Sequence, residues 1–299
     1  MKIFLTGSTG FVGAALCCEL MKMRHHLVFV GRKNPSFEFN YDFSRVDSIN
    51  SFSIYRSLTD CDVVIHAAAR VHVMNDTAND PLEMFREVNT FGTLNLARQA
   101  GVKRFVFISS IKVSGETTDL RSPFKYSDEP SPEDPYGISK FEAEIGLQKI
   151  AAETGMEVVI IRPVLVYGPG VKGNFKSLVS FVKRGFPLPL GLINNKRSMV
   201  GLDNLVDLII TCIDHPKAAN QTFLVSDDQD VSTTELLRKI GAAFGKKALL
   251  VPVPMSVLRF VGKIFGKSAE VDRLCGSLQV DIEHTKNTLN WKPPYTMEQ

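Results

Sequence analysis

Short apolar runs alternate with longer stretches of helical period along the first half of the chain. The runs are rich in β-branched and aromatic residues, which is typical of strands that are buried on both faces. They lie at 3–6, 27–30, 63–66, 104–109 and 158–162. The helical stretches lie at 11–24, about 81–100 and 136–154. This β-α-β-α order predicts an α/β fold built on a Rossmann-type doubly wound parallel sheet.

The rhythm changes after residue 168. Segment 169–197 is richer in Gly, Pro, Asn and Lys, and the later helical stretches lie at 203–214, 232–244 and 254–265. We therefore expect a first domain over 1–168 and a smaller C-terminal α/β lobe over 169–299, with an approximate boundary across which the chain can interleave. The polar, proline-bearing segment 116–135 predicts a long loop, and such loops are often functional.

Composition narrows the partners. Among 299 residues, 35 Lys and Arg face 32 Asp and Glu, for a net charge of +3, and this near balance predicts no nucleic-acid partner. The chain has no uninterrupted apolar stretch of the roughly 20 residues that a membrane helix needs, so we expect no membrane partner and a cytoplasmic location. The five cysteines lack the spacing of metal ligands, which predicts no metal site and a reducing compartment.

A glycine-rich turn, TGSTGFVG at 6–13, follows the first predicted strand and opens the first predicted helix. Gly7 permits the tight turn, Gly10 lets backbone N–H groups approach a diphosphate, and Gly13 lets the helix pack on the strand. The helix N-terminus adds partial positive charge. The turn predicts a dinucleotide site and gives the first domain its role.

The turn after the second strand bears on the choice of dinucleotide. A site that prefers NAD places Asp or Glu there, on the ribose hydroxyls, whereas this chain has Gly31-Arg32-Lys33. A guanidinium binds a 2′-phosphate and stacks on adenine. A solvated basic turn is the alternative interpretation, but Arg32 favours NADP(H) over NAD(H).

Three further residues form a candidate catalytic set. Ser110 follows a strand, and Tyr136 and Lys140 are four residues apart on a predicted helix, hence on one face. A phenol with a pKa near 10 is a poor base at neutral pH, and a nearby ammonium lowers that pKa. Ser110 can hydrogen-bond the reacting oxygen, so the set predicts proton transfer coupled to hydride transfer. His66, at a strand end, is expected to be packed rather than to carry protons.

Together these motifs resemble the extended short-chain dehydrogenase/reductase family, whose members are nucleotide-sugar epimerases, dehydratases and reductases. The resemblance covers nearly the whole chain. Besides the glycine turn, it rests on HAAA (66–69), Asn89 in VNTFGT, SS (109–110), YGISK (136–140), RPVLVYGPG (162–170), KRSMVGLDN (196–204) and LNWKPP (289–294).

The resemblance implies a role for each matching residue. Ser110, Tyr136 and Lys140 are implied to be catalytic. The implied cofactor-binding residues are Gly7, Gly10, Phe11, Val12, Gly13, Arg32, Asp42, Phe43, Ala67, Ala68, Asn89, Tyr136, Lys140 and Pro163. Of these, Asp42 and Phe43 are expected to follow a weak third strand and to contact adenine.

The substrate residues implied in the same way are Ser110, Asn174 and Arg197. The last two are assigned to the diphosphate of a UDP-sugar, and the fork of Arg197 suits a bidentate phosphate contact. Asn174 has an alternative interpretation as a turn residue, and Arg197 as a surface arginine. The resemblance also implies a homodimer.

Departures from the family pattern narrow the reaction. Ile111-Lys112 stands where the 4,6-dehydratases carry an Asp-Glu pair, which disfavours dehydration. Segments 72–85 and 107–116 are most similar to a branch of UDP-glucose 4-epimerases that includes 4-ketoreductases forming UDP-N-acetylquinovosamine.

The expected function is NAD(P)-dependent hydride transfer at C4 of a UDP-(N-acetyl)hexose. A 4-ketoreductase that makes surface-polysaccharide precursors is the main interpretation, because Arg32 favours NADPH, the usual reductant. The alternative is a UDP-glucose or UDP-N-acetylglucosamine 4-epimerase. A non-catalytic NAD(P)-binding scaffold is the third.

Overall fold

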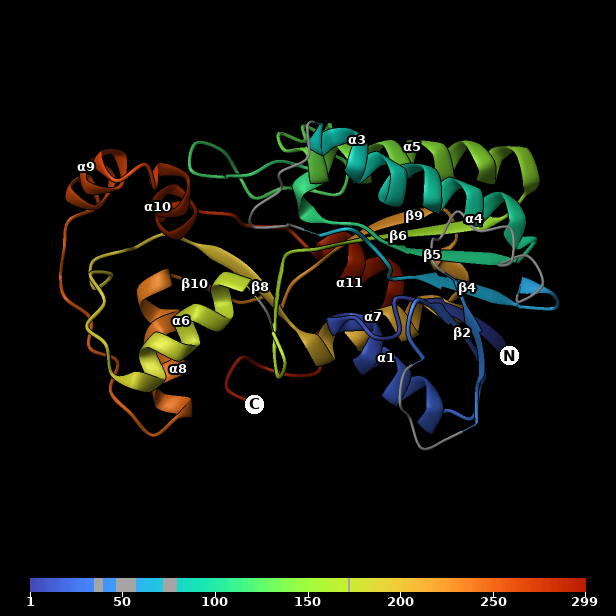
Figure 1. The fold of residues 1–299 in the computed structure, drawn as a ribbon, viewed down its shortest axis with the longest axis horizontal. Helices are drawn as coiled ribbons and strands as arrows, with labels where there is room; N and C mark the ends of the chain where they lie inside the picture. Colours follow the sequence, from blue (N-terminus) through green and yellow to red (C-terminus); the bar gives the residue numbers. More distant parts are fainter. Residues whose placement is uncertain (35–39, 47–57, 72–79, 172) are drawn as a thin grey trace.

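The computed structural model describes residues 1–34, 40–46, 58–71, 80–171 and 173–299. Figure 1 shows two parts, a large parallel sheet with helices on both faces and a smaller lobe beside it. Residues 35–39, 47–57, 72–79 and 172 lie outside this description. Most of segment 72–85, which contributed to the family resemblance, is therefore not described.

The large sheet has seven strands in the order β3-β2-β1-β4-β5-β6-β9, and every neighbouring pair is parallel. Its strands are β1 (Lys2–Thr6), β2 (His26–Gly31), β3 (Asp42–Arg45), β4 (Val63–His66), β5 (Arg104–Ile108), β6 (Glu157–Pro163) and β9 (Gln221–Val225). The predicted doubly wound sheet is confirmed. The strand order reverses between β1 and β4, and ligands of open α/β sheets bind beyond the carboxyl ends at such a point.

Helices cover both faces of this sheet (Figure 1). One face carries α1 (Phe11–Lys22), α7 (Leu202–Asp214) and α11 (Glu283–Leu289). The other carries α3 (Pro81–Phe85), the π-helix η1 (Arg86–Phe91), α4 (Gly92–Ala100) and α5 (Pro135–Thr154). Alternate residues of each strand enter opposite cores: Ile3 packs in the cluster of Leu16 and Leu205, and Phe4 in the cluster of Leu96 and Leu147.

The smaller lobe contains a three-stranded sheet in the order β10-β8-β7. Its elements are β7 (Leu165–Tyr167), α6 (Gly173–Arg184), β8 (Arg197–Gly201), β10 (Asp230–Val231), α8 (Thr233–Ala243), α9 (Met255–Ile264) and α10 (Ser268–Cys275). Two short 3₁₀ turns complete the described elements, η2 (Ile111–Val113) and η3 (Pro216–Ala218). The lobe has its own core, in which Met199, Phe175 and Leu237 are buried.

The chain interleaves the two parts. After β8 it returns to the large sheet as α7 and β9, and after the lobe's last helix it returns again as α11. The second part is therefore not one continuous stretch of chain. Helix α6 also lies inside a segment that had no predicted element.

No helix within the described ranges has the length and apolar composition needed to cross a membrane.

Candidate active site

The glycine turn joins β1 to α1, and its backbone lies very close to neighbouring backbone segments. Gly7 has a φ of 77°, and its carbonyl oxygen accepts a hydrogen bond from the Gly10 N–H at 2.8 Å. A Cβ atom at Gly13 would lie 2.1 Å from the Gly7 oxygen, and one at Gly7 would lie 2.7 Å from the Ala68 nitrogen. Only glycine fits at these two positions.

This turn brings the carboxyl end of β1 against the chain that follows β4. Ala67 and Ala68 pass directly beside Gly7, and the Ala68 N–H donates to Thr6 Oγ1 at 3.2 Å. Among the described residues, no side chain caps the N-terminus of α1 at Gly10. The first-turn N–H groups at Phe11 and Val12 thus lack a side-chain cap, and this backbone cradle fits the diphosphate of a dinucleotide.

His66 is a packed, neutral residue beside this cradle. Thr93 Oγ1 donates to the Asn89 carbonyl at 2.7 Å, so it accepts from His66 Nε2, which lies 2.9 Å away. The other ring nitrogen then accepts from Thr6 Oγ1 at 2.7 Å. Burial, aided by the charge of Lys140, lowers the pKa of His66 to about 3. The imidazole therefore holds the ends of β1 and β4 in place and does not carry protons near neutral pH.

Asn89 lies in the π-helix and uses its amide within the protein. Its Nδ2 donates to the Arg70 carbonyl and to Ser139 Oγ, both at 3.0 Å, and its Oδ1 accepts from the Arg70 N–H at 2.8 Å. These contacts fix the segment after β4 against α5. In this structure Asn89 therefore positions the backbone beside the predicted cofactor site through its bonds to Arg70 and Ser139. π-Helices are frequent at functional sites.

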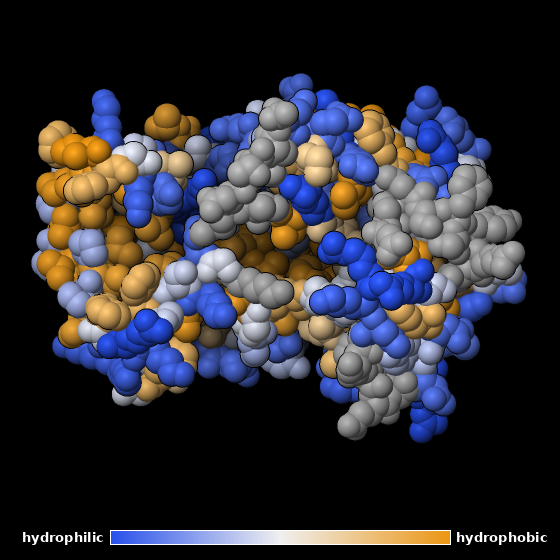
Figure 2. Space-filling view, viewed as in Figure 1, coloured by the Kyte–Doolittle hydropathy of each residue, from blue (hydrophilic) through white to orange (hydrophobic). Residues whose placement is uncertain are grey.

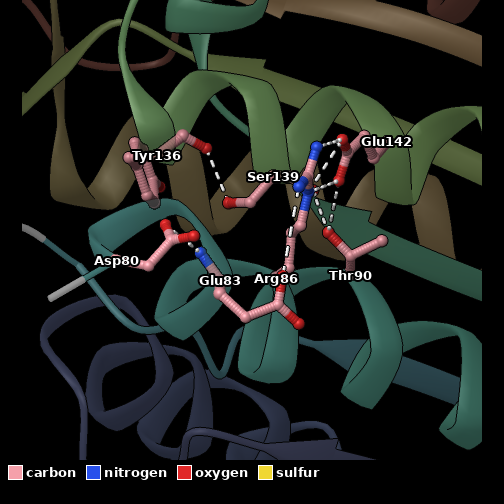
Figure 3. A network of polar contacts seen from close by, with 7 residues as sticks. All are labelled: Asp80, Glu83, Arg86, Thr90, Tyr136, Ser139 and Glu142. Atoms are coloured by element: carbon pink, nitrogen blue, oxygen red, sulfur yellow. Dashed lines mark hydrogen bonds and ion pairs between the residues drawn. The ribbon is translucent and has the colours of Figure 1, made fainter.

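A polar network ties the π-helix to the start of α5 (Figure 3). Arg86 binds Glu142 with two nitrogens, the shorter distance being 2.6 Å from Nη2 to Oε1. Thr90 Oγ1 donates to the Ser139 carbonyl at 2.9 Å, and Ser139 Oγ donates to the Tyr136 carbonyl at 2.8 Å. The network therefore holds the helical turn that carries Tyr136.

Two other contacts complete the setting of this turn. Asp80 caps α3 by accepting from the Glu83 N–H at 3.1 Å (Figure 3). Helix α3 ends in Phe85, whose ring meets that of Tyr136 edge-on, with centroids 6.0 Å apart. The phenol is thereby held from one side by an aromatic ring.

Ser110 and Tyr136 lie close together. Ser110 follows β5 and caps η2, accepting from the Lys112 N–H at 3.3 Å. Its side chain also hydrogen-bonds Tyr136. Burial raises the pKa of Tyr136 to about 12, the Asp134 charge raises it further, and the hydrogen bond with Ser110 opposes both. In this state the phenol holds its proton.

Lys140 is 1 % exposed and lies one helical turn beyond Tyr136. Its Nζ donates to the Ile108 carbonyl at 2.8 Å and sits 4.3 Å from the centre of the Phe107 ring. Burial lowers the pKa of Lys140 to about 7, against the charge of Glu144. The amine of Lys140 thus binds the strand end, and burial is the largest influence on the pKa of Tyr136.

Two polar clusters beside the trio were not predicted. Asp134 caps α5 by accepting from the Gly137 N–H at 2.6 Å, and its other oxygen lies 2.5 Å from Lys112 Nζ. Lys112 also contacts Glu116 at 2.7 Å. The Asp-Pro-Tyr order at 134–136, with proline in the first turn, was the available sequence signal for this cap.

The second cluster is the buried pair of Glu144 and Arg162, with Nη2 to Oε2 at 2.6 Å. Ser109 Oγ donates to Glu144, and Arg162 Nη1 lies 3.3 Å from Ser114 Oγ. The sequence signal was a polar residue at each strand end. Pro163, the last residue of β6, follows directly and is buried.

Of the remaining residues that were predicted to bind the cofactor, some lie where the sequence placed them and others do not. Arg32 is exposed directly after β2, at the carboxyl edge where it was expected. Asp42 and Phe43 form β3 rather than follow it. Asp42 opens the strand at its amino end and contacts His26 Nε2 at 2.8 Å, and Phe43 packs against the core. Asp42 therefore lies at the amino end of β3 and not after the strand, and the adenine contact assigned to these two residues stays a prediction.

The substrate predictions fall in the smaller lobe. Asn174 is exposed in the first turn of α6. Arg197 opens β8, and its Nη1 donates to the carbonyls of Arg273 at 2.6 Å and Gly276 at 3.2 Å. Burial lowers the pKa of its guanidinium, while the charge of Asp119 opposes that effect. Part of the Arg197 fork thus holds the end of α10.

Fold and site together define a dinucleotide-binding α/β protein with a serine, a tyrosine and a lysine at the carboxyl edge of its sheet. Residues 3–226 match the NAD dependent epimerase/dehydratase family. The chain belongs to this family, that of the extended short-chain dehydrogenases/reductases. The predicted family is confirmed.

Individual relatives span the whole chain. It is 54% identical over 303 residues to a UDP-glucose 4-epimerase of Vibrio cholerae, covering 100% of this chain and 92% of the relative. It is 26% identical to a GDP-6-deoxy-D-mannose reductase of Pseudomonas aeruginosa, covering 100% and 94%. Its fold matches that of a Thermotoga maritima UDP-glucose 4-epimerase with UDP-glucose, with a TM-score of 0.79, 23% identity, and coverage of 100% and 95%.

Proposed function

We propose that this protein is an NAD-dependent UDP-sugar 4-epimerase. The observation that carries the proposal is the 54% identity, over the whole chain, to the UDP-glucose 4-epimerase of Vibrio cholerae. That identity favours the epimerase over the 4-ketoreductase that was the main interpretation of the sequence. The intact set of Ser110, Tyr136 and Lys140 disfavours a non-catalytic scaffold.

The glycine turn is the part of the chain that would hold NAD. The diphosphate would lie against the backbone at Gly7 and Gly10 and the N-terminus of α1, where the peptide dipoles favour negative charge. When bound, NAD⁺ supplies an acceptor for the C4 hydride, returns that hydride to C4, and brings a positive charge into the site. The family description supports NAD, whereas the exposed Arg32 supports NADP(H).

Tyr136 and Ser110 would handle the proton. With Tyr136 as phenolate, its oxygen would take the proton of the 4-hydroxyl as the C4 hydride leaves the sugar, so the C4–H and O–H bonds of the sugar both break and a 4-keto sugar forms. Ser110 hydrogen-bonds the same oxygen, which places it against the phenol. After the keto sugar turns over, Tyr136 gives the proton back as hydride enters the other face.

The pKa values fit this role only with a cation in the site. Burial keeps the phenol of Tyr136 protonated, with a pKa of about 12, so a base at neutral pH needs a positive charge close by. Lys140 holds the strand end before Ser110, and its amine, with a pKa of about 7, can exchange protons near neutral pH. We assign to Lys140 the positioning of Ser110 and part of this charge.

The smaller lobe would select the sugar nucleotide. Arg197 still has guanidinium nitrogens besides Nη1 for a diphosphate, and Asn174 presents an amide in the first turn of α6. We keep both as proposed UDP-sugar contacts, and with them the division into a dinucleotide part and a sugar part. The homodimer also stays a proposal.

The test is an interconversion assay without added reductant. Purified protein is incubated with UDP-glucose or UDP-N-acetylglucosamine, and the products are identified by proton NMR. We expect the corresponding galacto sugars to form, and the Tyr136→Phe variant to lose this activity. If the protein forms none of them and instead consumes NADPH with UDP-4-keto-6-deoxy-N-acetylglucosamine, it is the 4-ketoreductase.

A further inference from the structure

Helix α9 has apolar residues on two opposite faces. On the inner face, Met255 and Leu258 pack against the core of the smaller lobe. Gly262, on the same face, lies so close to α10 that a Cβ atom there would be 2.7 Å from Val271 Cγ2. The inner face alone therefore accounts for the attachment of α9 to the protein.

The outer face of α9 is apolar and exposed. Phe260 and Ile264, four residues apart on one side of the helix, are 66% and 63% exposed, and Phe265 just beyond them is 72% exposed. Further large apolar side chains are 43–53% exposed, namely Leu249, Val251, Val257 and Val261. We call these seven residues the α9 surface. A helix that is apolar on two opposite faces is normally buried on both.

The α9 surface forms one end of the molecule. Figure 2 shows apolar residues gathered at the left-hand end, where Figure 1 places α9 and the chain that leads into it. That end belongs to the smaller lobe and points away from the large sheet and its glycine turn (Figure 1). A partner bound to the α9 surface would not contact Ser110, Tyr136 or Lys140.

The segment that carries this surface has basic residues only, and the nearest carboxylates along the chain are Glu270 and Asp272 of α10. Segment 244–267 contains no Asp or Glu, and its basic residues are Lys246, Lys247, Arg259, Lys263 and Lys267. Because the whole chain has a net charge of +3, the rest of the chain is net negative. The five positive charges are thus concentrated on one short segment, beside the exposed apolar side chains.

Most of these charges are available to a partner. Arg259 Nε lies 3.4 Å from Asp272 Oδ1, and Lys246 Nζ donates to the Lys183 carbonyl at 2.8 Å. Within the described part of the chain, Lys247, Lys263 and Lys267 have no ion-pair contact. On the helix, Arg259 and Lys263 are four residues apart and form a basic flank between the inner and outer faces.

We propose that the α9 surface binds to anionic lipid bilayers, with α9 lying in the plane of the membrane. Exposed aromatic and aliphatic side chains on one face and lysines beside them form the pattern of interfacial helices. Lysines near an anionic leaflet each strengthen binding, and the apolar side chains enter the boundary between headgroups and acyl chains. A second copy of this chain would instead bring one basic segment against another, which opposes association.

The absence of a membrane-spanning helix among the described residues is compatible with this proposal. The expectation of no membrane partner rested on the length of apolar stretches, and that criterion detects helices that cross the bilayer. A helix in the membrane plane is recognised by the distribution of its residues over its faces. The proposal is independent of the epimerase assignment.

The test is co-sedimentation of the full chain with phospholipid vesicles, without any sugar nucleotide. We expect binding to vesicles that contain phosphatidylglycerol, weak binding to pure phosphatidylcholine, and loss of affinity as salt is raised. Phe260→Ser combined with Ile264→Ser should lower the affinity at least about tenfold, since each removes an apolar group that the bilayer would bury. Lys263→Glu combined with Lys267→Glu should lower it by a similar factor.

The matched control is Leu120→Ser, which removes a side chain that is 101% exposed and lies outside segment 244–267. It should bind vesicles like the wild type, and thermal melting of every variant should match because all the changed residues are exposed. No binding to anionic vesicles overturns the proposal. So does binding that the Phe260 and Ile264 changes leave intact, or a concentration-dependent dimer that those changes abolish.

Discussion

Glu144 and Arg162 form an ion pair in which the two residues are 2% and 4% exposed. Arg162 Nη2 lies 2.6 Å from Glu144 Oε2, and Nε lies 3.1 and 3.2 Å from the two carboxylate oxygens. The pair joins β6 to the helix that carries Tyr136 and Lys140. Through Ser109, it also reaches the end of β5 next to Ser110.

Removing one member of this pair should destabilise the fold strongly. Glu144→Gln or Arg162→Met leaves the other charge buried without its partner, and we expect a loss of about 3–5 kcal/mol in the free energy of unfolding. The double variant should lose less than the sum of the two. Urea unfolding followed by circular dichroism measures this.

An exposed ion pair serves as the control for this prediction. Glu283→Gln removes a carboxylate that is mostly exposed and lies 2.6 Å from Lys286, so it should change the unfolding free energy little. A change of similar size at Glu144 and at Glu283 would contradict the role assigned to burial.

Lys140 should make stability depend on pH. Its pKa is about 7 in the folded protein and about 10.5 in the unfolded chain, so between these values the unfolded chain binds more protons. Stability contributed by this group therefore rises with pH above 7, by up to about 1.4 kcal/mol per unit, and the destabilisation is complete below pH 7.

The comparison of wild type with Lys140→Met isolates this effect from other titrating groups. We expect the unfolding free energy of the wild type, relative to the variant, to increase between pH 7 and pH 9. Lys149→Met, on an exposed position of the same helix, is the matched control and should show no such trend. A difference between wild type and Lys140→Met that stays constant with pH would refute a depressed pKa at Lys140.

Local patterns explain which parts of the fold were predictable. Strands buried on both faces, such as β5, leave a continuous apolar run, and the glycine turn requires glycine where backbones meet. β9 was missed because its run of five residues, QTFLV, begins with polar residues that are half-buried at the edge of the sheet. Its return to the large sheet depends on contacts distant in sequence.

The candidate site, like the fold, could be predicted only in part. Tyr136 and Lys140 could be paired from their spacing, because four residues make one helical turn. The pKa of each residue could not be predicted from the sequence, because it depends on burial and on the carbonyl that Lys140 Nζ binds. Asp42 was misplaced because a strand of four residues has too weak a pattern to locate its ends.

Gly7 should be essential for the cofactor site, and a second glycine isolates the reason. Gly7 and Gly155 have nearly equal φ values, 77° and 76°, but a Cβ atom at Gly7 would meet the backbone of Ala67 and Ala68, whereas none meets an atom within 4 Å at Gly155. Both Gly→Ala changes store about 1–2 kcal/mol of backbone strain. Gly7→Ala must also displace the chain after β4.

We therefore expect Gly7→Ala to abolish NAD binding, measured by isothermal titration calorimetry, and to lower the melting temperature more than Gly155→Ala does. Gly155→Ala should bind NAD like the wild type. Equal losses of binding in the two variants would show that conformational strain, and not the close approach to Ala67 and Ala68, is responsible.

Lys112 should tune the proton affinity of Tyr136 through Asp134. The Asp134 charge raises the pKa of Tyr136, and Lys112 lies 2.5 Å from that carboxylate. Although burial lowers the pKa of Lys112, its hydrogen bonds with Asp134 and Glu116 raise it overall, so the side chain stays a cation. The cation offsets the field that Asp134 exerts on the phenol.

Lys112→Met removes this cation, so the pKa of Tyr136 should rise and the acidic limb of the kcat/KM profile for UDP-sugar epimerisation should move to higher pH. A structural defect alone would lower the rate at every pH without moving the limb. Lys112→Arg keeps the charge and should restore the wild-type limb. A limb at the same pH in wild type and Lys112→Met would mean that Asp134 does not act on Tyr136 through its charge.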